Sequence, residues 1–193
     1  GYARATGRPG FVNVHIAAGL ANALSMLYDA YRGGTPLVVT AGQSDTRMLL
    51  HEPLLSGNLV EMTRQYTKWS AEILHAADLP TAIRRAFKVA AEPPSGPVFL
   101  SLPWNVLDEP TDVPGPASLT PVPAHYRIRP DQEALAQAVR LLAAAQRPVI
   151  LVGDRVAQSG AVGELVAVAE LLGAPVYATV YSEVNFPTSH PQY

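Results

Sequence analysis

The sequence predicts an α/β protein built on parallel sheets, and three features of the chain support this prediction. Short apolar runs rich in Val and Leu recur without the alternation of polar and apolar residues that marks a half-exposed strand. Such runs are typical of strands buried on both faces, as in a parallel sheet. Segments with apolar residues three and four positions apart lie between them and predict helices. Corners rich in small residues, Gly and Pro separate these segments, so strand, helix and strand should form right-handed βαβ units.

The first of these units organises the rest of the chain. Ligands of open α/β sheets bind in the crevice at the carboxyl ends of the strands. His15 ends the first apolar run, and Gln43 follows the second. We therefore expect any functional site to lie at this edge of the sheet. The expected elements of the unit are a strand at 11–15, a helix at 20–31 and a strand at 36–41.

A loop and four further elements should follow. Residues 43–58 are polar and irregular and contain two leucine pairs, so we expect a loop of functional length with one helical turn. Asp78 is the expected N-cap of the longest helix, and Pro80 fits its first turn. In chain order the expected elements are a short helix at 59–66, a short strand at 67–71, a helix at 78–91 and a buried strand at 97–102.

The composition then changes, which predicts a boundary between two domains. From Pro103 to Pro130, both included, there are seven prolines, and the hydrophobic periodicity is lost there. We expect a first domain at 1–105, a stiff linker at 106–129 and the start of a second domain at 130–193. Roughly 65 residues make a poor independent core, so the second domain looks truncated, and the chain looks cut at both ends. Its expected elements are a helix at 131–145 capped by Asp131, a strand at 148–152, a helix at 159–172 stopped by Gly173 and a strand at 175–179.

Composition excludes several classes of function. The 193 residues are 48% hydrophobic and 16% charged, with a net charge of −2 and no basic run, which argues against a nucleic-acid partner. The absence of cysteine excludes disulfides and thiolate metal sites and is compatible with a cytoplasmic location. No apolar run approaches about 18 residues, so we expect no membrane span. No cluster of His, Asp and Glu has metal-ligand spacing, so we expect no metal site within the chain.

Four segments, in this order and spacing, carry a resemblance to a known family: GYARATGRPGFVNVHIAAGLANAL, PLVVTAGQ, TKWS and GPVFLSLPWNV. They resemble the thiamine-diphosphate-dependent 2-oxo acid decarboxylases and acetolactate synthases over nearly the whole chain. The most similar branch is benzoylformate decarboxylase, because His15 stands where acetolactate synthases usually carry a Ser-Gly-Pro-Gly corner. The resemblance implies three α/β domains. Residues 1–105 would be the later part of the pyrimidine-binding domain, and residues 130–193 the start of the middle domain.

Two departures from the family pattern concern the cofactor. The glutamate that activates the pyrimidine precedes the GYARATG segment in the family and is not among these residues. The diphosphate-binding domain, whose Gly-Asp-Gly motif and distal Asn hold Mg²⁺, is not among them either. Gly153-Asp154-Arg155 is the nearest match and falls in the middle domain. We therefore expect thiamine diphosphate and Mg²⁺ in the parent enzyme, and no useful cofactor binding by this chain alone.

His15 is the candidate catalytic residue. A histidine titrates near neutral pH, and a decarboxylase has to move protons. The residues alone favour a histidine that ends a strand and bonds to backbone. The resemblance implies the catalytic interpretation, because the active-site histidine of the family falls on this position.

The other candidate site residues fall into two groups. The resemblance places Gly19, Asn22 and Gln43 beside the cofactor, and Leu54 and Leu55 against the substrate side chain. By residue type alone, Gly19 and Asn22 suit any loop-to-helix junction, Gln43 suits a solvated loop, and the leucines suit a core. The adjacent pair His51 and Glu52 is interpreted as exposed loop, and His190 as structural.

The implied function is decarboxylation of a small 2-oxo acid related to benzoylformate. In this family the cofactor lies between two subunits, so the resemblance implies a homodimer or homotetramer, with which the low charge accords. Two alternatives stay open. One is a carboligase of the acetolactate-synthase type, and the other is a truncated, inactive module that serves in assembly.

Overall fold

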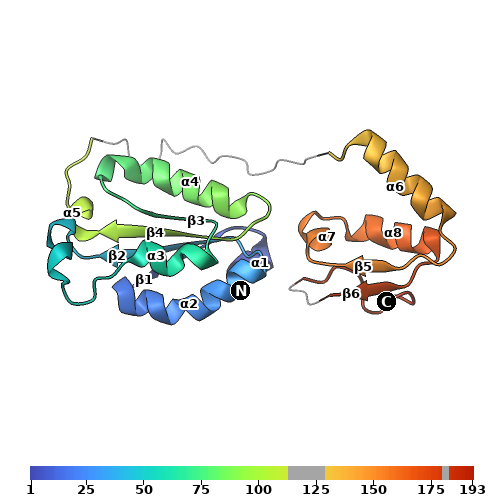
Figure 1. Cartoon of the computed structure of the whole chain (residues 1–193), viewed down its shortest axis with the longest axis horizontal. Helices are drawn as coiled ribbons and strands as arrows, with labels where there is room; N and C mark the ends of the chain where they lie inside the picture. Colours follow the sequence, from blue (N-terminus) through green and yellow to red (C-terminus); the bar gives the residue numbers. More distant parts are fainter. Residues whose placement is uncertain (113–128, 180–182) are drawn as a thin grey trace. The chain divides into compact units, whose positions relative to one another are not determined.

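The computed structural model describes residues 1–112, 129–179 and 183–193 (Figure 1). The chain divides into two compact units, Gly1–Tyr126 and Arg127–Tyr193. A parallel sheet with helices forms the centre of each unit, so the predicted α/β class is confirmed. Among the described residues, no helix is both long enough and apolar enough to cross a bilayer.

The first unit contains a parallel sheet with the strand order β1-β2-β4-β3. The two central strands pair along their whole length, from Leu37 opposite Pro97 to Gln43 opposite Pro103. Their central position explains why their sequences are continuous apolar runs. The elements in chain order are α1 (Tyr2–Thr6), β1 (Gly10–Val14), α2 (Ile16–Arg32), β2 (Leu37–Gln43), η1 (Thr46–His51), α3 (Leu59–Thr63), η2 (Arg64–Tyr66), β3 (Trp69–Glu72), η3 (Ala76–Asp78), α4 (Leu79–Ala91), β4 (Pro97–Pro103) and α5 (Trp104–Leu107).

Helices cover both faces of this sheet. Figure 1 shows α4 on one side and α2 with α3 on the other. Successive strand residues point to opposite faces, so Val98 packs in the cluster that contains Ala86 of α4, and Phe99 packs in the cluster that contains Leu20 of α2. All four side chains are fully buried. Burial of each large side chain, Leu20, Val98 and Phe99, stabilises the fold by about 1.5–3 kcal/mol. The helices on the two faces therefore hold the sheet in place, together with the strand ends that form the site.

Three predicted boundaries in the chain differ from the structure. Helix α2 begins at Ile16 rather than at residue 20, so the small residues Ala17, Ala18 and Gly19 already belong to the helix. Residues Trp104–Leu107 form α5, which extends two residues into the predicted linker, and residues 113–128 of that linker lie outside the described residues. Asp78 occupies the N-cap position of α4, but its side chain makes no capping hydrogen bond.

The second unit contains a two-stranded parallel sheet, β5-β6. The Asp131 side chain accepts a hydrogen bond from the Ala134 N–H at 2.8 Å and so caps the first helix, as predicted. The helix predicted at 159–172 begins at Val162, because Gly160 turns the chain with a positive φ of 68°, and a separate short helix, Arg155–Gln158, precedes it. His190 packs edge-on against Phe186. The elements are α6 (Gln132–Ala144), β5 (Ile150–Val152), α7 (Arg155–Gln158), α8 (Val162–Leu172) and β6 (Val176–Ala178).

Candidate active site

A pocket of about 490 Å³ opens at the carboxyl ends of β1, β2 and β4. This volume lies in the range of roughly 300–1,000 Å³ that small-molecule sites occupy. His15, Gln43 and Leu54 all line it, although they lie far apart in the sequence and were predicted to have different roles. The full lining is His15, Ile16, Gly42, Gln43, Ser44, Asp45, Met48, Pro53, Leu54, Leu102, Trp104 and Leu107.

His15 occupies the N-cap position of α2 with an extended backbone, φ −87° and ψ 102°. Its carbonyl accepts the first helical hydrogen bond, from the Gly19 N–H at 2.9 Å, while its imidazole makes no capping bond. The residue is exposed, and its side chain borders the pocket. The backbone of His15 therefore caps the helix, while its imidazole takes no part in the capping.

Ile16, the next residue, has a positive φ of 45°. A β-branched residue is a genuine outlier there, and such conformations cost about 1–3 kcal/mol and cluster at functional sites. This one residue converts strand β1 into helix α2 and so leaves His15 at the rim of the pocket. The sequence carries no signal for this conformation, because Ile is among the residues that avoid it.

The loop from 44 to 58 brings one of its two predicted leucines to the pocket. Leu54 lines the pocket and is 89% exposed, so it is not a core residue. Leu55 does not line the pocket and has a positive φ of 69°. The Leu55 carbonyl instead accepts a hydrogen bond from the Ala17 N–H at 3.3 Å, which satisfies a free donor in the first turn of α2.

Gln43 is buried, and both ends of its amide bond within the protein. Its Nε2 donates to the Gly57 carbonyl at 2.7 Å, and its Oε1 accepts from the Ser44 N–H at 2.9 Å. Gln43 also lines a neighbouring polar pocket of about 610 Å³, to which Glu72 contributes. Glu72 accepts a hydrogen bond from the Ser101 hydroxyl at 2.9 Å, and the sequence analysis missed this pair.

Gly19 and Asn22 lie on the first turns of α2, outside the lining of the pocket around His15. The three atoms nearest to a Cβ added to Gly19 would be atoms of Val14 and His15, at 3.5 to 3.7 Å. Those are ordinary contacts, so packing within this chain does not require glycine at this position. Asn22 is exposed.

The one carboxylate in the pocket lining belongs to Asp45, which forms an ion pair with Arg47. The Arg47 guanidinium donates hydrogen bonds to Asp45 and lowers the pKa of that carboxyl below its usual value. Asp45 also accepts from the Arg47 N–H at 2.9 Å and so caps η1. No Lys or Arg is among the residues that line the pocket. The pocket therefore suits an apolar or neutral group better than an anion.

The apolar wall of the pocket was only partly foreseen. Met48, Trp104 and Leu107 line it together with Leu54. The sequence analysis did not single them out, because Trp104 and Leu107 lie at the start of a Pro-rich stretch. Their exposed fractions, 49% for Met48 and 65% for Trp104, show large apolar side chains without a buried environment of their own.

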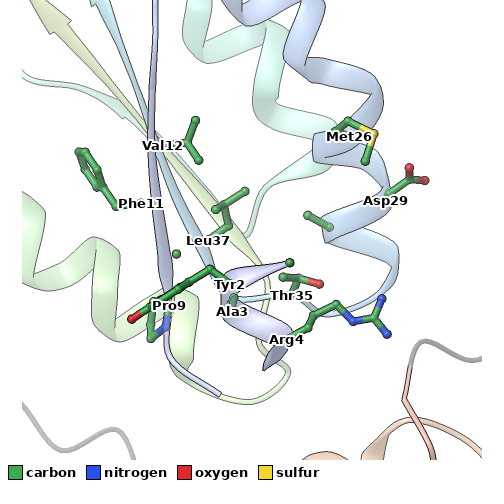
Figure 2. A pocket seen from close by; sticks show the side chains of 13 residues that line it. Tyr2, Ala3, Arg4, Pro9, Phe11, Val12, Met26, Asp29, Thr35 and Leu37 are labelled. Atoms are coloured by element: carbon green, nitrogen blue, oxygen red, sulfur yellow. The ribbon is translucent and has the colours of Figure 1, made fainter. Parts of the chain in front are cut away.

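A larger pocket of about 700 Å³ lies at the opposite, amino-terminal end of β1 (Figure 2). Figure 2 shows Tyr2, Phe11, Val12 and Leu37 around it. Sites of open parallel sheets lie at the carboxyl ends of strands, and neither His15 nor another predicted site residue lines this larger pocket. We therefore assign the site to the smaller pocket.

A pocket at the carboxyl edge of a parallel sheet, with an imidazole and an apolar wall, places this chain among α/β proteins that bind an organic ligand there. Residues 1–65 match the family described as "Thiamine pyrophosphate enzyme, N-terminal TPP binding domain". Residues 135–193 match "Thiamine pyrophosphate enzyme, central domain". The chain belongs to the thiamine pyrophosphate enzymes, as the resemblance predicted.

Relatives of two activities match nearly the whole chain. Benzoylformate decarboxylase of Pseudomonas aeruginosa is 35% identical over 98% of this chain and 36% of its own length. Acetolactate synthase 1, chloroplastic, of Zea mays is 34% identical over 99% of this chain and 30% of its own length. The structure of the thiamine diphosphate-dependent 4-hydroxybenzoylformate decarboxylase of Rhodococcus jostii RHA1 is 32% identical, with a TM-score of 0.88 over 99% of this chain and 36% of that one. The chain thus spans about a third of the length of these relatives.

Proposed function

We propose that this chain is part of a thiamine-diphosphate-dependent enzyme that decarboxylates a 2-oxo acid with an aromatic or branched side chain. The observation that carries the proposal is His15, whose imidazole borders an apolar pocket at the carboxyl edge of the sheet. The similarity to benzoylformate decarboxylase supports an aromatic substrate. The similarity to 4-hydroxybenzoylformate decarboxylase supports the same choice.

The residues around the pocket fit the ring end of the cofactor rather than its diphosphate. The lining is largely apolar and holds one carboxylate and no Lys or Arg, so it suits a neutral ring. Gly19, Asn22 and Gln43 would lie beside the pyrimidine. Among the described residues, no three His, Cys, Asp or Glu side chains gather as metal ligands do, so Mg²⁺ and the diphosphate would be held by other polypeptide.

The cofactor, when bound, supplies the electron sink for decarboxylation. His15 would accept or donate the proton at its ring nitrogen, since an imidazole changes charge near neutral pH. Leu54 and Trp104 would hold the aryl ring of the substrate and exclude water. The apolar wall would also strip water from the substrate carboxylate, which favours loss of CO₂.

Assembly and location extend this proposal. A site shared between two subunits would make the active form a homodimer or homotetramer. The cytoplasmic location stays a prediction, since the maize relative carries "chloroplastic" in its name.

The second candidate is a carboligase of the acetolactate-synthase type. The maize acetolactate synthase matches this chain almost as well as the decarboxylase does, at 34% against 35% identity. The products formed from pyruvate separate the two, because a carboligase joins two molecules and a decarboxylase releases acetaldehyde. An inactive assembly module would give neither product.

Replacement of His15 by Ala tests the proposal in the enzyme that carries this chain. We expect kcat for benzoylformate to fall by about 10²- to 10⁴-fold, because general acid–base catalysis is lost, with little change in cofactor affinity. Steady-state kinetics with thiamine diphosphate and Mg²⁺ provide the measurement. His75→Ala is the matched control, since His75 is exposed and does not line the pocket. Unchanged turnover in His15→Ala would remove this histidine from the mechanism.

A further inference from the structure

We propose that Asn105 and Thr46 form a clasp that fixes the width of the pocket and thereby sets which substrate side chain it accepts. This inference rests on the function proposed above and adds a pair of positioning residues to it. Neither residue lines the pocket, and neither is required for proton transfer.

The clasp consists of two hydrogen bonds between residues 59 positions apart. Asn105 Oδ1 accepts from the Thr46 N–H at 2.9 Å, and Asn105 Nδ2 donates to Thr46 Oγ1 at 3.0 Å. Both ends of one amide thus bond to both polar groups of one residue. Two such bonds fix the orientation of the joined segments, whereas a single bond would let them pivot. Both bonds are partly buried, which strengthens them relative to exposed ones.

The clasp joins two segments that both contribute to the apolar wall. Thr46 begins η1, whose Met48 lines the pocket. Asn105 belongs to α5, whose Trp104 and Leu107 also line it. The Trp104 Nε1–H donates to the Asp108 carboxylate, which orients the indole within α5. The separation of these apolar side chains therefore depends on the Asn105–Thr46 bonds.

The other end of the loop is anchored independently. Gln43 Nε2 holds the Gly57 carbonyl at 2.7 Å, and the Ala17 N–H holds the Leu55 carbonyl at 3.3 Å. Between the clasp at Thr46 and these anchors, Leu54 is 89% exposed and lacks a packed environment that would hold it in place. The anchors at Gly57 and Leu55 connect to β2 and α2, close to His15. Loss of the clasp should therefore reshape the wall without displacing the imidazole.

The size of the substrate decides how much the clasp matters. A phenyl ring bound here would contact more of the apolar wall formed by Met48, Leu54 and Trp104 than the methyl group of pyruvate would, because it is larger. Misplacement of a binding wall by about an ångström can cost up to 100-fold in rate. We expect the effect to appear for benzoylformate and not for pyruvate.

The test uses two pairs of variants in the enzyme that carries this chain, assayed with thiamine diphosphate and Mg²⁺. Asn105→Ala removes both bonds of the clasp, and Thr46→Val removes the bond to the Thr46 hydroxyl. Asn105→Asp and Thr46→Ser keep it, because an aspartate accepts from both the Thr46 N–H and its hydroxyl. We expect the first pair to lower kcat/KM for benzoylformate about tenfold, mainly through KM, and to change kcat/KM for pyruvate less than about twofold. The second pair should stay within about twofold of the wild type for both substrates.

Two results would overturn the inference: an unchanged benzoylformate-to-pyruvate ratio in Asn105→Ala and Thr46→Val, or an equal loss for both substrates, which indicates a structural role. If the wild type acts on neither acid, the proposed function fails. In that case, hydrogen exchange of residues 46–55 tests, independently of any activity, whether the Asn105–Thr46 bonds hold this loop. Faster exchange in Asn105→Ala than in Asn105→Asp supports it, and equal exchange refutes it.

Discussion

Asp45 combines a capping role with an ion pair at the mouth of the pocket. Its carboxylate accepts from the Arg47 N–H and from the Arg47 guanidinium, and the guanidinium bonds are the main cause of its lowered pKa. The ionised form is thus favoured in the folded loop. The Arg47 side chain is 79% exposed, so the effect is local rather than a large part of global stability.

The pH dependence of the loop follows from the direction of this shift. A depressed pKa means that the contribution of Asp45 is complete above its unfolded value of 3.8 and is lost as the pH falls through the folded value. We expect hydrogen-exchange protection of residues 46–51, corrected for intrinsic rates, to be constant near neutral pH and to decrease below pH 3.8. Asp45→Asn should remove this pH dependence. A wild-type loop whose protection stays flat through the acid range would contradict the role of the carboxylate.

At the scale of single residues, sequence predicts chemistry better than backbone conformation. His15 and Gln43 could be placed at one edge because each follows an apolar run, and the carboxyl ends of parallel strands meet there. The positive φ of Ile16 and of Leu55 could not be predicted, because both residue types avoid that region. Only the tertiary contacts around the pocket select it.

At the scale of elements, Lys68 connects the start of β3 to the end of α4. Its Nζ donates to the Val89 carbonyl and, at 2.6 Å, to the Glu92 carbonyl. The last carbonyls of a helix lack intrahelical partners and carry partial negative charge, so an ammonium group satisfies both needs. Lys68 is only partly exposed, and its methylene chain lies near Gly96.

Replacement of Lys68 by Met should therefore destabilise the first unit. We expect the free energy of unfolding to fall by about 1–3 kcal/mol, since hydrogen bonds to a charged group are lost while the apolar stem is kept. Urea unfolding of the protein gives the measurement. Lys88→Met is the control, because Lys88 is an exposed residue of α4, the helix whose carbonyls Lys68 binds. Equal midpoints for the two variants would show that the Lys68 bonds add nothing.

Element boundaries show what periodicity can and cannot determine. The central strands were predicted within two residues at each end, because their burial on both faces demands continuous apolar runs. Helix α5 was missed, because its four residues follow a proline and are too few to show a period. The N-cap of α6 was predicted correctly, since Asp131 bonds locally to the first turn and needs no tertiary context.

At the scale of the whole molecule, charge determines what this chain can bind by itself. A diphosphate needs cations, and the lining of the pocket offers Asp45 and no Lys or Arg. The net charge of the chain is −2, so its long-range field does not attract an anion either. The apolar wall can hold a ring, but the lining offers no cationic partner for the phosphates.

The 193-residue chain should therefore fail to bind thiamine diphosphate usefully, with or without Mg²⁺. Calorimetry should detect no micromolar affinity, and thiamine without its diphosphate should bind no more weakly, because the phosphates find no partner in this pocket. A polypeptide that adds a diphosphate-binding domain should bind the diphosphate form with a strong preference over thiamine. Micromolar binding by the 193 residues alone would mean that Lys or Arg side chains outside this pocket bind the diphosphate. The hypothesis that two parts of the protein share the cofactor site would then be wrong.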